Sequence, residues 1–252
     1  VHAAARAHVL RETAPDPLQV FRAVNTLGTI TLARQAAESG VRRFVFLSSI
    51  GVNGDRSDRP FAESDEPNPR EAYAISKLEA ENGLWAIARE TGMQVVILRP
   101  PLVYGANAPG NIGRLAAAVL KGTRLPLGAV TSNRRTFLAL DNLTDVVATC
   151  VAHPAAAGQV FLAGDSEDLS TADLLRRMAL AFEAPLRMLP VPVWILRAGG
   201  AALGRRTTVR SLCDSLQVDT SKARDLLGWR PLIGVDEGLR RMAQRSLRDQ
   251  TP

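Results

Sequence analysis

Tyr73 and Lys77 stand four residues apart in a segment that predicts a helix over residues 69–91. Four residues make about one helical turn, so both side chains leave the same face of the helix. A neighbouring ammonium favours the phenolate, and we therefore expect Lys77 to lower the pKa of Tyr73. A tyrosine tuned in this way can donate and accept a proton near neutral pH. The spacing therefore predicts a proton-transfer site.

Two serines, Ser48 and Ser49, directly follow the apolar run of residues 44–47 (FVFL). An apolar run without alternation is typical of a strand that is covered on both faces, as in a parallel sheet. Ligands of open α/β sheets bind at the carboxyl ends of the strands. A serine hydroxyl at this place can hold a substrate oxygen while Tyr73 exchanges its proton.

The segments around these residues alternate between strand and helix. Residues 1–5 (VHAAA) predict a short buried strand, and a helix follows, with Asp16 as its N-cap, Pro17 at its first position and Gly40 after its end. Another buried strand is expected at 95–98, after the helix over 69–91. This βαβ order predicts an α/β fold with a doubly wound parallel sheet.

The composition of the sequence changes after Gly105: glycine and proline become frequent, and the predicted helices and strands become short. We expect two domains: residues 1–105 form part of a dinucleotide-binding domain, and residues 106–252 form mainly a smaller α/β substrate lobe. A strand near 160–163 is expected to return to the main sheet.

Composition and charge exclude several classes of protein. The most apolar stretch, residues 188–204, is interrupted by Pro190, Pro192 and Arg197, so no membrane span is expected. The net charge of +6 comes from basic residues that are interleaved with acids, which argues against nucleic acid as a partner and allows a phosphate-bearing ligand. Cys150 and Cys213 stand in apolar surroundings, which indicates reduced packing residues of a cytoplasmic protein. We expect no metal site.

Ser49, Tyr73 and Lys77, in this order, resemble the catalytic triad of the short-chain dehydrogenase/reductases. Further motifs of this sequence are similar to those of the extended, nucleotide-sugar branch of that family and occur in the same order along the chain. These are residues 1–5 (VHAAA, similar to VHLAA, with Ala3 in place of leucine), 25–29 (NTLGT), 99–105 (RPPLVYG), 135–143 (RTFLALDNL, with Ala139 where histidine is common), 219–223 (DTSKA) and 227–231 (LGWRP).

The resemblance implies a role for each matching residue. Tyr73 would be the general acid and base, Lys77 would bond the nicotinamide ribose, and Ser49 would hold the sugar oxygen. Contacts to the cofactor, NAD or alternatively NADP, would come from Ala4, Ala5, Asn25, Ser48, Tyr73, Lys77, Pro100 and Leu102. Contacts to a UDP-sugar substrate would come from Ser49, Asn111 and Arg135. For Asn111, a helix cap before Ile112 is an equally good interpretation.

The glycine-rich turn that this family uses to hold the pyrophosphate is absent, because no G-x-x-G-x-x-G precedes Ser49. We therefore expect an N-terminally truncated sequence whose first strands and glycine-rich loop are missing. The fragment alone is then expected to lack part of the cofactor site.

Three reactions of the family compete. Dehydratases carry an Asp-Glu pair after the triad serine or threonine, whereas Ile50 and Gly51 stand here and cannot move a proton. The motif set favours a 4-epimerase of a UDP-hexose or UDP-N-acetylhexosamine, working through a 4-keto intermediate. Asn53, where many epimerases have tyrosine, favours the alternative, a 4-keto reductase of a UDP-6-deoxy-sugar in surface-polysaccharide synthesis.

A non-catalytic dinucleotide sensor on the same fold is the alternative of another class. Such proteins commonly lose the tyrosine or the lysine, and this chain keeps both Tyr73 and Lys77. The sequence therefore predicts an enzyme, and we expect it to be a homodimer.

Overall fold

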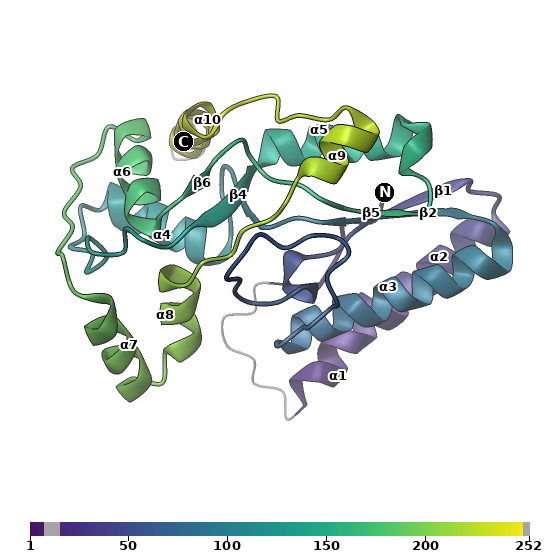
Figure 1. Cartoon of the computed structure of the whole chain (residues 1–252), viewed down its shortest axis with the longest axis horizontal. Helices are drawn as coiled ribbons and strands as arrows, with labels where there is room; N and C mark the ends of the chain where they lie inside the picture. The colour runs from purple at the N-terminus through teal and green to yellow at the C-terminus, as the bar shows by residue number, and fades with distance from the viewer. Residues whose placement is uncertain (8–15, 249–252) are drawn as a thin grey trace.

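The computed structural model describes residues 1–7 and 16–248, and it holds a three-stranded parallel sheet in the order β1-β2-β5 (Figure 1). Its strands are β1 (Arg43–Leu47), β2 (Gln94–Arg99) and β5 (Gln159–Leu162). β5 lies beside β2 although about sixty residues separate them in sequence, so the strand expected near 160–163 does lie in this sheet. The predicted α/β fold, a Rossmann-like parallel sheet between helices, is confirmed.

Helices cover both faces of this sheet. One face packs against α2 (Thr29–Glu38) and the long helix α3 (Ala72–Thr91), and the preceding α1 (Pro17–Phe21) and π-helical η1 (Arg22–Gly28) pack against α3. The other face packs against α5 (Leu140–Ala152) and α9 (Ser221–Leu227). Successive strand residues alternate between these two layers: Phe44 and Phe46 face α3, and Val45 faces α5. This explains why the strand sequences are apolar throughout.

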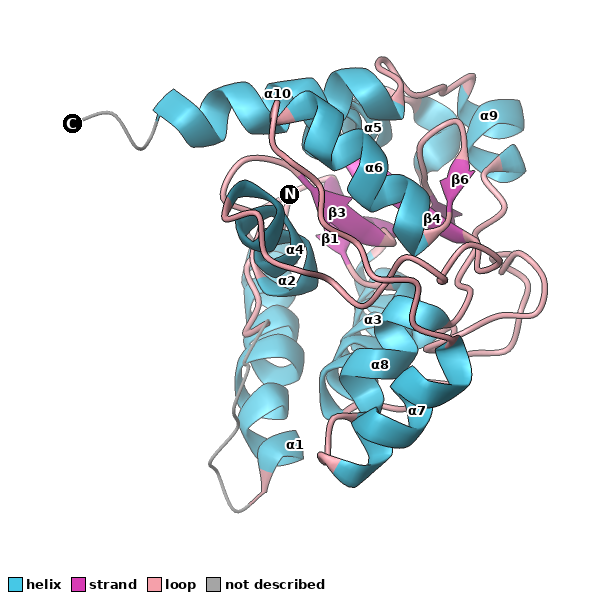
Figure 2. Ribbon diagram, turned by 90° about the vertical axis from the view of Figure 1, so that its left-hand side faces the viewer, coloured by secondary structure: helices cyan, strands magenta, loops and turns pink. Residues whose placement is uncertain are grey.

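A second, smaller sheet has the order β3-β4-β6, with β3 parallel and β6 antiparallel to β4. Its strands are β3 (Leu102–Tyr104), β4 (Arg135–Ala139) and β6 (Asp168–Leu169). Around it lie α4 (Gly110–Leu120), α6 (Thr171–Ala181) and α10 (Val235–Arg248), and at one end α7 (Val193–Ala202) and α8 (Arg206–Cys213) (Figure 2). Short 3-10 turns are η2 (Ile50–Val52) and η3 (Pro154–Ala156).

Three local expectations can be compared with the structure. Residues 1–5 do not form a buried strand: only His2 bridges to Phe46, and Val1 is exposed. The reason is that this segment pairs with β1 on one side alone among the described residues. The helix expected from residue 69 begins at Ala72, because Glu71 is still extended. Asp16 and Pro17 do begin the first helix, with the Asp16 carboxylate accepting the Gln19 amide at 3.2 Å.

No helix between residues 16 and 248 is long and apolar enough to cross a membrane. Cys150 and Cys213 are both buried and free. No group of three or more histidine, cysteine or acidic side chains among residues 1–7 and 16–248 could hold a metal ion.

Tyr104 at the end of β3 joins several elements of the smaller lobe. Its hydroxyl donates to Asp165 at 2.7 Å, and Asp165 also accepts the Ala139 amide and the Asn142 side chain. Burial, reinforced by this carboxylate, raises the pKa of Tyr104 and keeps the phenol protonated. Gly238 of α10 leaves room for the ring, because a Cβ there would lie 2.5 Å from the Tyr104 oxygen.

We expect Gly238→Ala to destabilise the protein although alanine favours a helix. Overpacking against Tyr104 costs about 1–3 kcal/mol, whereas the helix propensity of alanine returns only about 1 kcal/mol. Gly199→Ala is the matched control, because a Cβ at Gly199 of α7 meets nothing within 4 Å. Chemical denaturation should show a lower free energy of unfolding for Gly238→Ala and an equal or higher one for Gly199→Ala. Equal effects of the two substitutions would contradict this packing.

Candidate active site

The carboxyl ends of β1 and β2 open into a pocket of about 750 Å³. Ser48 and Ser49 reach it from β1, Pro100 reaches it from β2, and Tyr73 and Lys77 reach it from α3. The structure therefore brings the three residues Ser49, Tyr73 and Lys77 into one cavity. This is the edge at which parallel sheets bind their ligands.

Lys77 is almost completely buried, with a relative exposure of 1%. Its ammonium lies 3.8 Å from the centroid of the Phe46 ring, which is a cation–π contact. Burial lowers the pKa of Lys77 to about 7, and the carboxylate of Glu81 acts in the opposite direction. Lys77 can therefore change its charge near neutral pH.

Tyr73 does not behave as the sequence led us to expect. Burial raises the pKa of its phenol, so the expectation that Lys77 lowers this pKa is wrong for this structure. The physical reason is desolvation, which disfavours the phenolate where the ring is enclosed. Phe21 contributes to that enclosure, because its ring meets the Tyr73 ring edge to face at 6.1 Å between centroids.

A buried ion pair lies behind Lys77. Arg99, the last residue of β2, donates to the carboxylate of Glu81 from Nε at 3.0 Å and from Nη2 at 2.5 Å. The hydroxyl of Ser48 donates to the same carboxylate, and the third nitrogen of Arg99 donates to Asn53 at 3.0 Å. The network joins α3, β1, β2 and η2, and Glu81 is a site residue that was not predicted from the sequence. Its signal was available: an acid one helical turn after Lys77, on the buried face of the helix.

The two serines have different surroundings. Ser49 Oγ accepts the Gly51 amide at 3.1 Å, and this residue lines the pocket. Ser48 also lines the pocket, but its hydroxyl is directed to Glu81. Ser49 is therefore the better placed of the two to meet a substrate oxygen.

The residues expected to touch a cofactor fall into two groups. Ala5, Pro100 and Leu102 line the pocket, whereas Ala4 does not, because Ala3, Ala5 and Ala7 are the alternating positions that face it. Asn25 is not a lining residue either.

Asn25 instead fastens residues 1–7 to the helical layer. Its Oδ1 accepts the Arg6 amide at 2.8 Å, and its Nδ2 donates to the Arg6 carbonyl and to Ser76, each at 3.1 Å. Asn25 lies in the π-helical turn η1, a kind of distortion that is frequent near functional sites. Its place in the structure is that of a support for the pocket wall.

Arg135, expected to hold the substrate diphosphate, lines the same pocket. It is buried, which lowers its pKa, and it donates to the Asp214 carbonyl at 2.9 Å. Asn111 does not line the pocket. Its amide donates to Ser211, a lining residue, at 2.8 Å. Asn111 is not a helix cap either, because α4 begins at Gly110 and has no side-chain cap.

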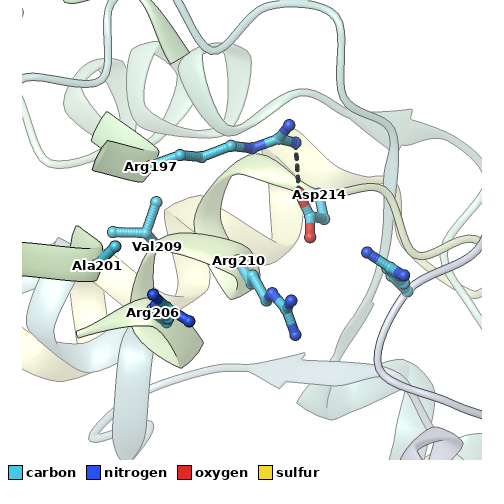
Figure 3. A pocket seen from close by; sticks show the side chains of 7 residues that line it. Arg197, Ala201, Arg206, Val209, Arg210 and Asp214 are labelled. Carbon is cyan, nitrogen blue, oxygen red and sulfur yellow. Dashed lines mark hydrogen bonds and ion pairs between the residues drawn. The ribbon is translucent and has the colours of Figure 1, made fainter. Parts of the chain in front are cut away.

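Two further basic residues of the pocket were not predicted from the sequence. Arg70 and Arg210 both line it. Arg210 also lines an adjoining cavity of about 280 Å³ between α7 and α8, together with Arg56, Arg197 and Arg206 (Figure 3). Arg197 in this cavity is paired with Asp214 at 2.7 Å. Arg70 lies just before α3 and Arg210 lies in α8, so no local motif predicts that they share a pocket.

Comparison with known proteins gives the family. Residues 1–164 match the NAD dependent epimerase/dehydratase family. The chain belongs to this family. Over 98% of its length it is 44% identical to the UDP-glucose 4-epimerase of Vibrio cholerae, of which it covers 76%. The resemblance inferred from the Ser-Tyr-Lys order is thereby confirmed at the level of the family.

Solved structures of epimerase/dehydratase proteins have the same fold. The dTDP-glucose 4,6-dehydratase of Streptomyces venezuelae, solved with NAD bound, superposes with a TM-score of 0.75 at 26% identity, covering 98% of this chain and 72% of that one. The UDP-N-acetylglucosamine 4-epimerase of Bacillus cereus superposes with a TM-score of 0.78 at 21% identity, covering 97% of this chain and 78% of that one. The second likeness concerns the fold alone.

The buried Lys77 predicts a pH-dependent effect of Lys77→Met on stability. The folded pKa is about 7 and the unfolded one is about 10.4, so between these values the unfolded chain binds more protons. Wild-type stability therefore gains from this group as the pH rises. The stability advantage of Lys77→Met over the wild type should be largest below about pH 7 and shrink towards about pH 10.

Denaturation of the two proteins at several pH values measures this difference and cancels the other titrating groups. Lys121→Met is the control, because Lys121 is exposed and its removal should leave the pH dependence unchanged. A Lys77→Met difference that stays constant with pH would contradict the buried, titrating ammonium.

Proposed function

We propose that this protein is a nucleotide-sugar 4-epimerase that acts on a UDP-hexose or UDP-N-acetylhexosamine, with NAD as its cofactor and NADP as the alternative. The observation that carries the proposal is the single pocket that Ser49, Tyr73, Lys77 and Arg135 share. The 44% identity to a UDP-glucose 4-epimerase supports the choice of reaction within the family.

The pocket offers a wall that fits a nicotinamide and its ribose. Ala3, Ala5 and Ala7 have small side chains, and Pro100 and Leu102 add apolar surface beside Lys77. Lys77 would bond the ribose, and in its charged form it would favour the Tyr73 phenolate against the desolvation that raises the pKa of Tyr73. The cofactor, when bound, supplies the acceptor and donor of a hydride.

The chain's own residues would carry the proton. Tyr73 would take the proton of the sugar C4 hydroxyl while the C4 hydride leaves, and Ser49 would bond the resulting 4-keto oxygen. Once the sugar had rotated in the pocket to present its opposite face, Tyr73 would return the proton to the C4 oxygen. No net oxidation remains after one cycle.

Arg135 and Arg210 would hold the diphosphate of the substrate. Both line the pocket, and a guanidinium fork matches phosphate oxygens in pairs. Arg135 keeps its orientation through the Asp214 carbonyl. Asn111 would act indirectly, through its bond to Ser211.

The alternatives lose support at particular residues. Ile50 and Gly51 line the pocket and offer no acid or base, which argues against dehydration. Asn53 does not line this pocket, and its side chain is bonded to Arg99 and to the Ala62 carbonyl, so it no longer favours a 4-keto reductase. The presence of both Tyr73 and Lys77 in the pocket argues against a non-catalytic sensor.

The proposal includes a homodimer and a cytoplasmic location. Val24, Leu27 and Leu32 are large apolar side chains exposed on η1 and α2. A second copy of the chain at this helical surface would remove them from water.

The reaction predicts interconversion without consumption of cofactor. The full-length protein should interconvert UDP-glucose and UDP-galactose, or their N-acetylated forms, with no net change in NAD(P)H absorbance. Tyr73→Phe should lower kcat by roughly two to four decades and leave nucleotide-sugar binding intact, because it removes only the proton carrier. Stoichiometric loss of NAD(P)H with a 4-keto sugar would replace the epimerase with the reductase, and cofactor binding without turnover of any nucleotide sugar would indicate the sensor.

The diphosphate contact predicts that Arg210→Ala weakens substrate binding. Loss of a charge-assisted contact of about 1.5–3 kcal/mol corresponds to a rise of roughly 10- to 150-fold in KM. Arg206→Ala is the matched control, because Arg206 lines only the adjoining cavity. Binding of UDP and of NAD, measured separately by calorimetry, should weaken for UDP alone. Equal losses from both arginines, or no loss for UDP, would refute this contact.

A further inference from the structure

Helix α7 presents an unusual apolar face to solvent. Val193, Leu196 and Gly200 face the smaller lobe, which leaves the opposite side of the helix uncovered. That side is the α7 apolar face, formed by Trp194, Ile195, Ala198, Ala202 and Leu203. Trp194 is 70% exposed and Leu203 is 74% exposed. In both views of the molecule α7 lies at its periphery beside α8, and no other described element covers it (Figures 1 and 2).

The chain around this face is strongly basic. Residues 185–213 contain five arginines and no acidic residue, so here the mixing of charges seen elsewhere in the sequence does not hold. Arg187 precedes α7, and Arg205 and Arg206 follow it, all three exposed. Asp214, which directly follows this stretch, is paired with Arg197 at 2.7 Å (Figure 3).

An exposed tryptophan with aliphatic neighbours between flanking arginines is the chemistry of a helix that lies in a membrane interface. The indole and leucine side chains leave water for the headgroup region, while each nearby arginine is attracted to anionic lipid. We propose that the α7 apolar face, with Arg205 and Arg206, docks this protein on an anionic lipid bilayer surface.

Charge distinguishes this occupant from a second copy of the chain. Two α7 faces brought together would place the exposed Arg205 and Arg206 of both copies near one another, with no acid between residues 185 and 213 to balance them. Anionic phospholipid headgroups balance the same charge. Docking would also orient the arginine-lined cavity between α7 and α8, and through Arg210 the mouth of the active-site pocket, towards the membrane surface.

Vesicle binding tests the proposal independently of turnover, so it can fail while the proposed function stands. The full-length protein should sediment with phosphatidylglycerol/phosphatidylcholine vesicles and remain free of pure phosphatidylcholine vesicles. Trp194→Ser/Leu203→Ser should weaken the binding by about tenfold or more, since it removes the apolar anchor. Leu180→Ser is the matched control, because Leu180 on α6 is 78% exposed, and this variant should bind as the wild type does.

A second pair of variants tests the charge. Arg205→Glu/Arg206→Glu should weaken binding to the anionic vesicles by about tenfold or more, whereas Arg42→Glu/Arg89→Glu, which changes the net charge equally at exposed positions, should have little effect. All of these side chains are exposed, so the unfolding transition should not move.

Three results would overturn the proposal. They are equal binding to neutral and anionic vesicles, anionic binding that survives Trp194→Ser/Leu203→Ser, and a change of solution mass in that variant without vesicle dependence. The last result would assign the α7 apolar face to a second copy of the chain.

Discussion

Glu81 and Arg99 form an ion pair almost without access to solvent, and most of the candidate site is built on it. Two nitrogens of the guanidinium meet the carboxylate, and the third reaches Asn53. The pair fixes α3 against the end of β2, and Ser48 attaches the end of β1 to the same carboxylate. Loss of one partner from a buried pair costs about 3–5 kcal/mol, because the other charge is left without compensation. A change in the geometry of this pair would therefore shift α3, and with it Tyr73 and Lys77.

The same carboxylate also acts on Lys77. Burial disfavours the ammonium, and Glu81, one turn further along α3, favours it. The balance leaves the pKa of Lys77 near neutrality. The protonation state of such a lysine can change with the ligand that fills the pocket, and its burial therefore serves the function of the site.

The two lobes contribute different kinds of charge. The ends of β1 and β2 and helix α3 supply an enclosed acid–base centre, and β4 and α8 supply Arg135 and Arg210 to the same pocket. A sugar nucleotide has two matching parts, a hydroxylated ring for the acid–base centre and a diphosphate for the arginines. The excess of arginine continues beyond the pocket onto α7, where it meets an apolar face. Substrate binding and surface attachment would then draw on one continuous basic region.

The sequence by itself determined what is local. The spacing of Tyr73 and Lys77, the apolar run before Ser48 and the Asp16-Pro17 helix start depend on neighbours within about one turn or one strand, so the order of the residues is enough to predict them. The resemblance added Arg135, which does line the pocket. We could not derive in this way the raised pKa of Tyr73, the supporting role of Asn25 or the position of Asn111 outside the pocket. The position of Arg210 in the pocket could not be derived either.

Only the tertiary structure decided these features, because each depends on residues far away in the chain. Asn25 meets Ser76, and Asn111 meets Ser211, across long stretches of sequence. Desolvation is a property of everything that surrounds a group, and no motif of a few residues contains that information. The exposed side of α7 also depends on the tertiary structure. An apolar run predicts burial, and only the packed structure reveals which of its faces was left outside.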